Sequence, residues 1–141
     1  MAGELLLDTG ALVSLLDRSQ KQHSDFVRFF DSWTGPVVAS EAVLTESTHL
    51  LGRISSGRKT CIDFFLAGGA VLVPSTLASL RRSRELIEKY EDLPMDFADS
   101  TLVVLAEELD TNRVFTTDHQ DFSVYRILGR GHFVIEPPQA T

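Results

Sequence analysis

The chain has 141 residues, 43% of them hydrophobic, and a formal net charge of −7, which is typical of a single globular domain. This acidic balance argues against a protein that binds nucleic acid over its whole surface, and the single cysteine excludes an internal disulfide framework and a cysteine-built zinc site. No apolar run approaches the roughly 20 residues of a membrane-spanning helix, and the N-terminus lacks the features of a signal peptide. We therefore expect a cytoplasmic protein with no membrane association.

Short apolar runs alternate with longer segments of helical spacing along the chain. The runs are residues 5–7, 36–40, 68–74, 113–117 and 132–136. The helical segments are residues 10–18, 22–33, 41–54, 57–67, 76–91 and 96–110. Strands that are apolar throughout and alternate with helices indicate a parallel sheet covered on both faces. We therefore predict an α/β fold, a three-layer α/β/α sandwich with a central parallel sheet, as one domain over residues 1–141 with a loose tail at about 137–141.

Two aspartates directly follow predicted strands. Asp8 ends the run "LLL", and Asp118 follows "VFTT". In open parallel sheets, ligands bind outside the carboxyl ends of the strands, so both carboxylates are expected on the functional edge. The alternative is that each aspartate caps the helix after it, because Asp is a favoured N-cap residue.

The segment "MDFADSTLVVLAEELD" carries a carboxylate inside an apolar stripe. At about 100° per residue, Asp99 lies among Leu102, Val103 and Leu105 on the predicted helix. A carboxylate facing the core is unfavourable unless it is paired, hydrogen-bonded or bound to a metal. Its place in the first turn leaves a second interpretation open, in which Asp96 and Asp99 form a pair resembling a capping box.

The segment "SEAVLTESTHLLGRI" supplies a further acid. Its apolar stripe contains Leu50 and Leu51, with Ser40 as the predicted N-cap. Glu46 lies at the edge of this stripe, whereas Glu41 points away from it. Glu46 is therefore the acid of this helix that can reach the edge of the sheet.

Four acids from distant parts of the chain are thus expected at one place: Asp8, Glu46, Asp99 and Asp118. Two carboxylates 4 Å apart repel each other by about 4 kcal/mol at an effective dielectric constant near 20. Hard oxygen ligands of this kind suit Mg²⁺ or Mn²⁺. Such an ion can polarise a phosphodiester and lower the pKa of a water molecule, so the pattern favours a metal-dependent phosphodiester hydrolase.

The successive motifs "LLLDTGALVSLLD", "VLTESTHLL", "MDFADSTLVVLAEEL" and "VFTTDHQDF" resemble those of PIN-domain nucleases, and most of all the VapC-type toxins of toxin–antitoxin pairs. The resemblance spans nearly the whole chain. It implies a parallel sheet within an α/β/α sandwich, a Mg²⁺ or Mn²⁺ site and endoribonuclease activity. It also implies RNA as substrate, a small cognate antitoxin as partner, and a homodimer.

The same resemblance assigns residues to the site. Asp8, Glu46 and Asp99 match the first three acids of the family. The fourth acid stands either directly after the "TT" pair or just before the Phe, so Asp118 is favoured and Asp121 is the alternative, with Asp96 as an additional candidate ligand. Thr9 would offer its hydroxyl beside the metal, and Thr117 could orient Asp118 or a water molecule, unless either hydroxyl only satisfies loop backbone.

The densest basic cluster is "RRSRE". Arg81, Arg82 and Arg84 could bind the RNA backbone, because arginine pairs with phosphate in a bidentate manner. The alternative is a solvated helix face with ion pairs between residues four apart, such as Arg84 with Glu88.

Other functions remain to be weighed against the nuclease. A phosphatase of the haloacid-dehalogenase type needs an acid two residues after the first, where this chain has Gly10, and no P-loop motif is present. Two alternatives stay open: a catalytically inactive PIN-like module that binds RNA or protein, and a PIN nuclease in RNA processing outside a toxin–antitoxin system.

Overall fold

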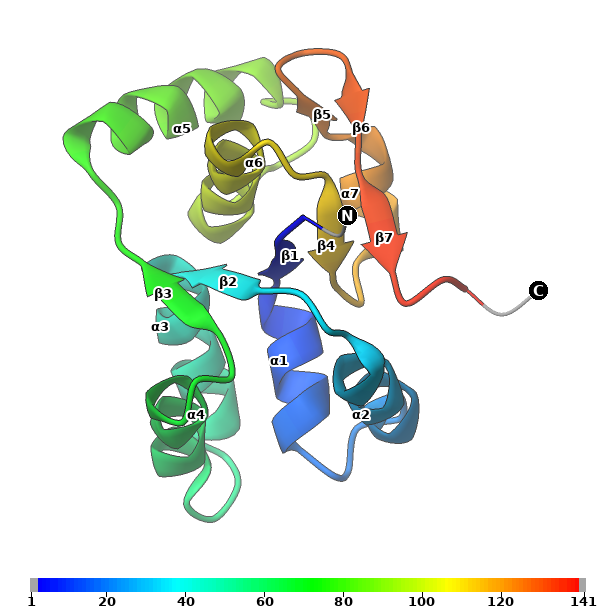
Figure 1. Ribbon diagram of the computed structural model, residues 1–141. Coiled ribbons are helices and arrows are strands. Elements are labelled where there is room, and N and C mark those ends of the chain that lie inside the picture. The colour runs from blue at the N-terminus through cyan, green and yellow to red at the C-terminus, as the bar shows by residue number, and fades with distance from the viewer. Residues whose placement is uncertain (1–2, 140–141) are drawn as a thin grey trace.

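The computed structural model describes residues 3–139 and contains a parallel sheet with helices on both faces (Figure 1). The sheet strands are β1 (Leu5–Leu7), β2 (Val37–Ser40), β3 (Val71–Val73), β4 (Arg113–Phe115) and β7 (Val134–Glu136). The helices are α1 (Thr9–Leu16), α2 (His23–Ser32), α3 (Glu41–Leu51), α4 (Gly57–Leu66), α5 (Leu77–Lys89), α6 (Phe97–Leu109) and α7 (His119–Val124). A hairpin of β5 (Arg126–Ile127) and β6 (Gly131–His132) completes the regular structure.

The strand order is β3-β2-β1-β4-β7, and every pairing in this sheet is parallel. β1 lies in the centre, and Leu5, Leu6 and Leu7 are fully buried because helices cover both of its faces. Leu7 pairs with Phe115 of β4, so the residues that follow the two strands emerge side by side. The predicted α/β/α sandwich with a central parallel sheet is confirmed.

The helices form the two outer layers. In the view of Figure 1, α1 to α4 lie below the sheet, and α5 and α6 lie above it. α6 is buried on nearly every side, since it packs on β1 and β2 and against α3 and α5. On the other face, Phe26 of α2 stacks on Phe115 of β4 with ring centroids 5.0 Å apart. Both helical layers pack against the central strands and thereby fix the positions of the residues at the strand ends.

Local signals set where two of these helices begin. Ser40 accepts a hydrogen bond from the Val43 amide at 3.2 Å and caps α3, as predicted. Thr76 and Ser79 bond reciprocally and form a capping box at the start of α5.

The structure differs from the sequence prediction at β3, which was expected to be covered on both faces. Val71 is 60% exposed and Leu72 is 39% exposed, because β3 is an edge strand at the end of the sheet. Leu50, expected in the buried stripe of α3, is 42% exposed. The hairpin β5–β6 and the short helix α7 were not predicted, because neither is long enough to produce a clear periodic pattern.

The described end of the chain faces α2 across a hollow. Pro137, Pro138 and Gln139 border a hollow together with Phe26 and Phe29. The remainder of the predicted tail, residues 140–141, lies outside the described residues. Within the described part, the longest helices, α5 and α6, have 13 residues each, and no helix has the length and apolarity needed to cross a bilayer.

Candidate metal centre

The site begins where β1 and β4 end. From β1 the chain continues to β2 and β3 on one side of the sheet, whereas β4 lies on the other side of β1. The order in which strands are added to the sheet therefore reverses between β1 and β4. This arrangement leaves a crevice at the carboxyl ends of the two strands, which is where open parallel sheets bind their ligands. Asp8 follows β1, and Thr116, Thr117 and Asp118 follow β4.

Asp8 is held by its neighbour across the sheet. Its amide donates to the Phe115 carbonyl at 3.0 Å, and its Oδ2 accepts a hydrogen bond from the Thr116 hydroxyl at 2.6 Å. Thr116 is fully buried and its Oγ1 also accepts from the Asp118 amide at 2.9 Å. Asp8 stands at the N-cap position of α1 but makes no capping hydrogen bond with its side chain. The capping interpretation of Asp8 is therefore wrong.

α6 places Asp99 opposite these residues. Asp96 is the N-cap of α6 and accepts a hydrogen bond from the Asp99 amide at 2.8 Å, so the capping interpretation is correct for Asp96. The Asp99 side chain is half-buried, and its Oδ2 accepts a hydrogen bond from the Tyr125 hydroxyl at 2.7 Å. Tyr125 is fully buried and fixes the direction of this carboxylate.

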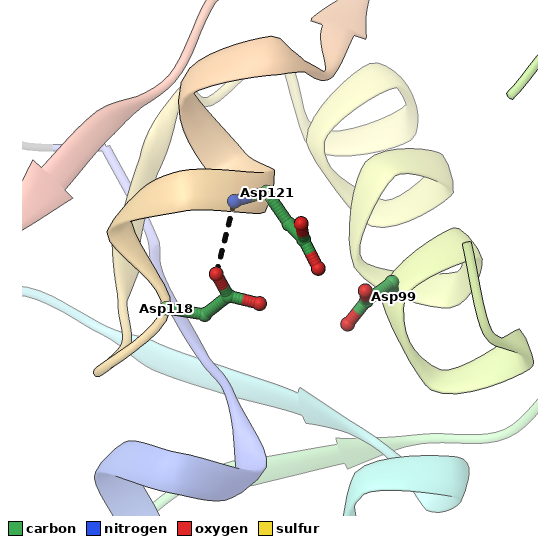
Figure 2. A group of neighbouring side chains, drawn as sticks. All are labelled: Asp99, Asp118 and Asp121. Atoms are coloured by element: carbon green, nitrogen blue, oxygen red, sulfur yellow. Dashed lines mark hydrogen bonds between the residues drawn. The ribbon is translucent and has the colours of Figure 1, made fainter. Parts of the chain in front are cut away.

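Asp118 and Asp121 complete a cluster with Asp99. Carboxylate oxygens of the three residues lie within 4.8 Å of one another, and Figure 2 shows the three side chains pointing into a common space. Asp118 also caps α7, because its Oδ1 accepts from the Asp121 amide at 2.9 Å. Asp118 therefore both caps α7 and belongs to the acidic cluster. The structure brings both candidates for the fourth acid, Asp118 and Asp121, to the same place.

An open pocket of about 540 Å³ joins this cluster to the remaining acids. Its acidic lining residues are Asp8, Glu46, Asp96, Asp99, Asp118 and Asp121. Glu46 reaches the pocket from α3, and Leu50, one turn later on the same helix, lines it too. Glu41 is exposed and does not line the pocket. The structure therefore gathers the predicted acids around one space.

Burial and like charges both act on these carboxyl groups. Burial, with the charges of Glu46 and Asp118, raises the pKa of Asp8 to about 6, against the opposing hydrogen bond from Thr116. Burial raises the pKa of Asp99 to about 7, with the charges of Asp8 and Asp118 adding to it and the Tyr125 hydrogen bond opposing it. The ionised forms are thus disfavoured where the acids converge, which is the electrostatic signature of a site that a cation would neutralise.

The pKa of Asp121 is raised as well, by burial first and then by the charge of Asp118. A second observation points to a ligand. Thr9 Oγ1 is buried, lies on the pocket wall and has no hydrogen-bond partner within the described residues. A buried hydroxyl without a partner is uncommon in folded proteins and points to a bound ligand or water molecule at this place. The donor set, consisting of carboxylate oxygens and a hydroxyl, fits a hard divalent cation such as Mg²⁺ or Mn²⁺.

Thr117, predicted to orient Asp118, lines the pocket, but the hydroxyl that bonds the Asp118 amide belongs to Thr116. A Cβ atom on Gly10 would lie 2.1 Å from Thr117 Oγ1, so the start of α1 approaches this loop closely.

The structure does not bring the predicted arginine cluster to the acids. Arg82 donates to both carboxylate oxygens of Glu107, at 2.8 and 2.9 Å, and ties α5 to α6. Arg81 and Arg84 line a separate shallow hollow with Leu77 and Leu80. The basic residue in the lining of the acidic pocket is Arg53, from the connection between α3 and α4.

Comparisons with known proteins agree with this architecture. A family model for the PIN domain matches residues 5–128. Ribonuclease VapC26 of Mycobacterium tuberculosis is 30% identical over 135 residues, which cover 94% of this chain and 100% of the relative.

Among solved structures, VapC20 of M. tuberculosis, a toxin that cleaves the sarcin–ricin loop, has a TM-score of 0.77 at 18% identity, over 82% of this chain and 91% of that chain. The DNA-bound VapBC complex of Salmonella typhimurium has a TM-score of 0.63 at 13% identity, over 96% and 98%. At these identities the structural likeness shows the fold alone. The match to the family model covers most of the sequence, and the identity to VapC26 extends along nearly all of it. The chain therefore belongs to the PIN-domain family, as a relative of the VapC-type ribonucleases.

Proposed function

We propose that this protein is a metal-dependent endoribonuclease that hydrolyses phosphodiester bonds in RNA and acts as the toxin of a toxin–antitoxin pair. The observation that carries the proposal is the convergence of Asp8, Glu46, Asp99, Asp118 and Asp121 on one pocket at the carboxyl ends of β1 and β4. The ribonuclease name of the 30% identical relative supports RNA as the substrate class. A cytoplasmic location is part of the same proposal.

The carboxylates of Asp99, Asp118 and Asp121 would hold Mg²⁺ or Mn²⁺, with Asp8 and Glu46 completing the acidic wall. Bound there, the ion would polarise the scissile phosphodiester and lower the pKa of a water molecule.

The protein's own groups supply orientation. Thr116 fixes Oδ2 of Asp8, whose side chain lines the pocket. Tyr125 does the same for Asp99 from the opposite wall. The two acids with the raised pKa values can therefore accept a proton near neutral pH at defined positions.

The proposal is tested by incubating the purified protein with RNA in Mg²⁺ or Mn²⁺, and again after addition of EDTA. Cleavage is expected with either metal and should stop with the chelator. Glu46→Gln should abolish cleavage, whereas the matched control Glu41→Gln, on the same helix but exposed, should leave it unchanged. If Glu46→Gln and Asp99→Asn cleave RNA as the wild type does, the acids are not catalytic. An RNA- or protein-binding module then becomes the better account.

Toxin–antitoxin complexes among the structures that share this fold support a small antitoxin as partner. Exposed apolar side chains support a protein contact: Leu77 at 72% and Leu80 at 41% border the same hollow on α5. We assign this surface to a homodimer. Light scattering should give twice the chain mass for the wild type and the single mass for Leu77→Asp. A wild-type protein that is monomeric at micromolar concentration would contradict the dimer without affecting the nuclease proposal.

A further inference from the structure

Arg53 is the basic residue of the acidic pocket. It lies in the loop between α3 and α4, and it is the one Lys, Arg or His that lines the pocket within residues 3–139. The pocket lining otherwise carries six acids. RNA is a polyanion, so a strand entering this pocket meets repulsion that a cation in the wall would reduce.

The position of Arg53 is set by Asp17. Arg53 Nη2 donates to Asp17 Oδ2 at 3.1 Å, and the Asp17 side chain is 4% exposed. Asp17 is fixed independently of Arg53, because it also accepts from the Ser19 amide and hydroxyl and from Gln20 Nε2, at 3.0, 2.7 and 3.1 Å. These hydrogen bonds, with that from the Ser19 hydroxyl contributing most, hold the pKa of Asp17 well below its usual range. Asp17 is therefore a permanent anchor for the guanidinium.

The anchor leaves most of the guanidinium available. An arginine has five N–H donors, and the bond to Asp17 engages one nitrogen. No second protein acceptor for Arg53 occurs in the described part of the chain, and its side chain is 59% exposed. The remaining edge of the guanidinium can therefore donate to a ligand while Asp17 keeps its direction.

Arg53 and Asp8 lie at opposite ends of α1. Asp8 precedes α1 and Asp17 follows it. At a rise of 1.5 Å per residue, their Cα atoms are separated by about 13 Å. The guanidinium, bonded to Asp17, thus lies near the opposite end of α1 from the catalytic carboxylates.

We propose that Arg53 binds a phosphate of the RNA strand that flanks the cleaved position, with Asp17 as its positioning residue. The inference rests on the proposed ribonuclease function and adds the path of the substrate to it. The RNA strand runs from the acids along α1 toward the α3–α4 loop. Arginine suits this role because its planar fork pairs with phosphate oxygens while one nitrogen stays engaged elsewhere.

The test uses the full chain and a mixed-sequence single-stranded oligoribonucleotide. Arg53→Ala should raise KM roughly tenfold or more with little change in kcat, as expected for loss of a charged hydrogen bond outside the reacting centre. The slope of log affinity against log salt should become shallower by about 0.7, the value for one phosphate contact on a single strand. Lys59→Ala is the control, because Lys59 is paired with Asp63 on α4 and does not line the pocket.

Neutral methylphosphonate linkages identify the contact. Such linkages are placed one at a time along the oligoribonucleotide. At one flanking position, the neutral linkage should weaken RNA binding by the wild type but not by Arg53→Ala. Arg53→Lys should restore part of the RNA affinity that Arg53→Ala loses.

Arg53→Ala that behaves like Lys59→Ala in an active enzyme overturns the inference. So does a loss of thermal stability with no position-specific effect, since Arg53 would then only tie the two loops together. Failure of the proposed function looks different, because the wild type itself would neither bind nor cleave RNA.

Discussion

Replacing Asp8 by asparagine separates the structural role of this residue from its role in a cation site. Asp8 is buried, and its carboxylate is held by Thr116 at 2.6 Å, so the substitution keeps the shape and an acceptor oxygen for that bond. It removes a negative charge that is repelled by the negative charges of Glu46 and Asp118. Metal-free protein should therefore become more stable, while binding of a divalent cation weakens.

The magnitude follows from the pKa of Asp8. A rise from 3.8 to about 6 corresponds to roughly 3 kcal/mol of stability lost when this group is ionised in the folded protein. Asp8→Asn should recover up to about that amount at pH 8 in EDTA. For a chain of this length, the melting temperature should increase by up to about 10 °C.

The sign of the pH dependence makes the test specific. Because the pKa of Asp8 is higher in the folded than in the unfolded protein, the folded state binds more protons between about pH 4 and pH 6. Wild-type stability contributed by this group is present below pH 4 and is lost as the pH rises through 6. The advantage of Asp8→Asn should therefore be small at pH 4, grow up to pH 6 and stay constant above pH 7.

Thermal denaturation followed by circular dichroism at pH 4, 6 and 8, with EDTA throughout, measures this. Glu41→Gln, an exposed acid on α3, is the control and should change the melting temperature little at any pH. If Asp8→Asn lowers the melting temperature at pH 8, the carboxylate stabilises the metal-free fold, and the reasoning from charge convergence fails.

Three further predictions concern the same region. Thr116→Val leaves Asp8 and the Asp118 amide without their buried partner, so urea unfolding should show a loss of about 1–3 kcal/mol, whereas Thr116→Ser should not. Gly10→Ala brings a Cβ atom to 2.1 Å from Thr117 Oγ1 and should destabilise the fold. Thr117→Ala in the same chain should relieve this destabilisation. If the two substitutions instead lower the free energy of unfolding additively, the clash is absent. Protonation of Asp8 and Asp99, whose pKa values are about 6 and 7, removes negative charge from the cation site, so Mn²⁺ affinity measured by calorimetry should fall steeply below pH 6. An affinity independent of pH from 5 to 8 would contradict a cation site beside these two carboxyl groups.

Much of this site is predictable because its acids mark the ends of buried elements. Asp8 interrupts an apolar run, and Asp99 interrupts an apolar helical stripe, so each stands out from its local pattern. Their convergence follows from a general property of parallel sheets, whose carboxyl ends share one edge. Glu46 could be separated from Glu41 by helical periodicity alone.

The supporting residues depend on register and long-range packing. Whether Thr116 or Thr117 turns inward is set by the pairing of β4 with its neighbours, and a run that is buried on both faces carries no alternation from which to read it. Tyr125 reaches Asp99 from a segment 26 residues away, and Arg53 reaches Asp17 across 36 residues. The exposure of β3 follows from its place at the edge of the sheet, and strand order is not encoded in any local pattern.

Diffraction from crystals soaked in Mn²⁺, with the anomalous signal of the metal, tests the central claim most directly. An anomalous peak should lie between the carboxylates of Asp99, Asp118 and Asp121, and it should be absent from crystals of Asp99→Asn. No peak among these oxygens at saturating Mn²⁺, or a peak that lies elsewhere, would contradict the account.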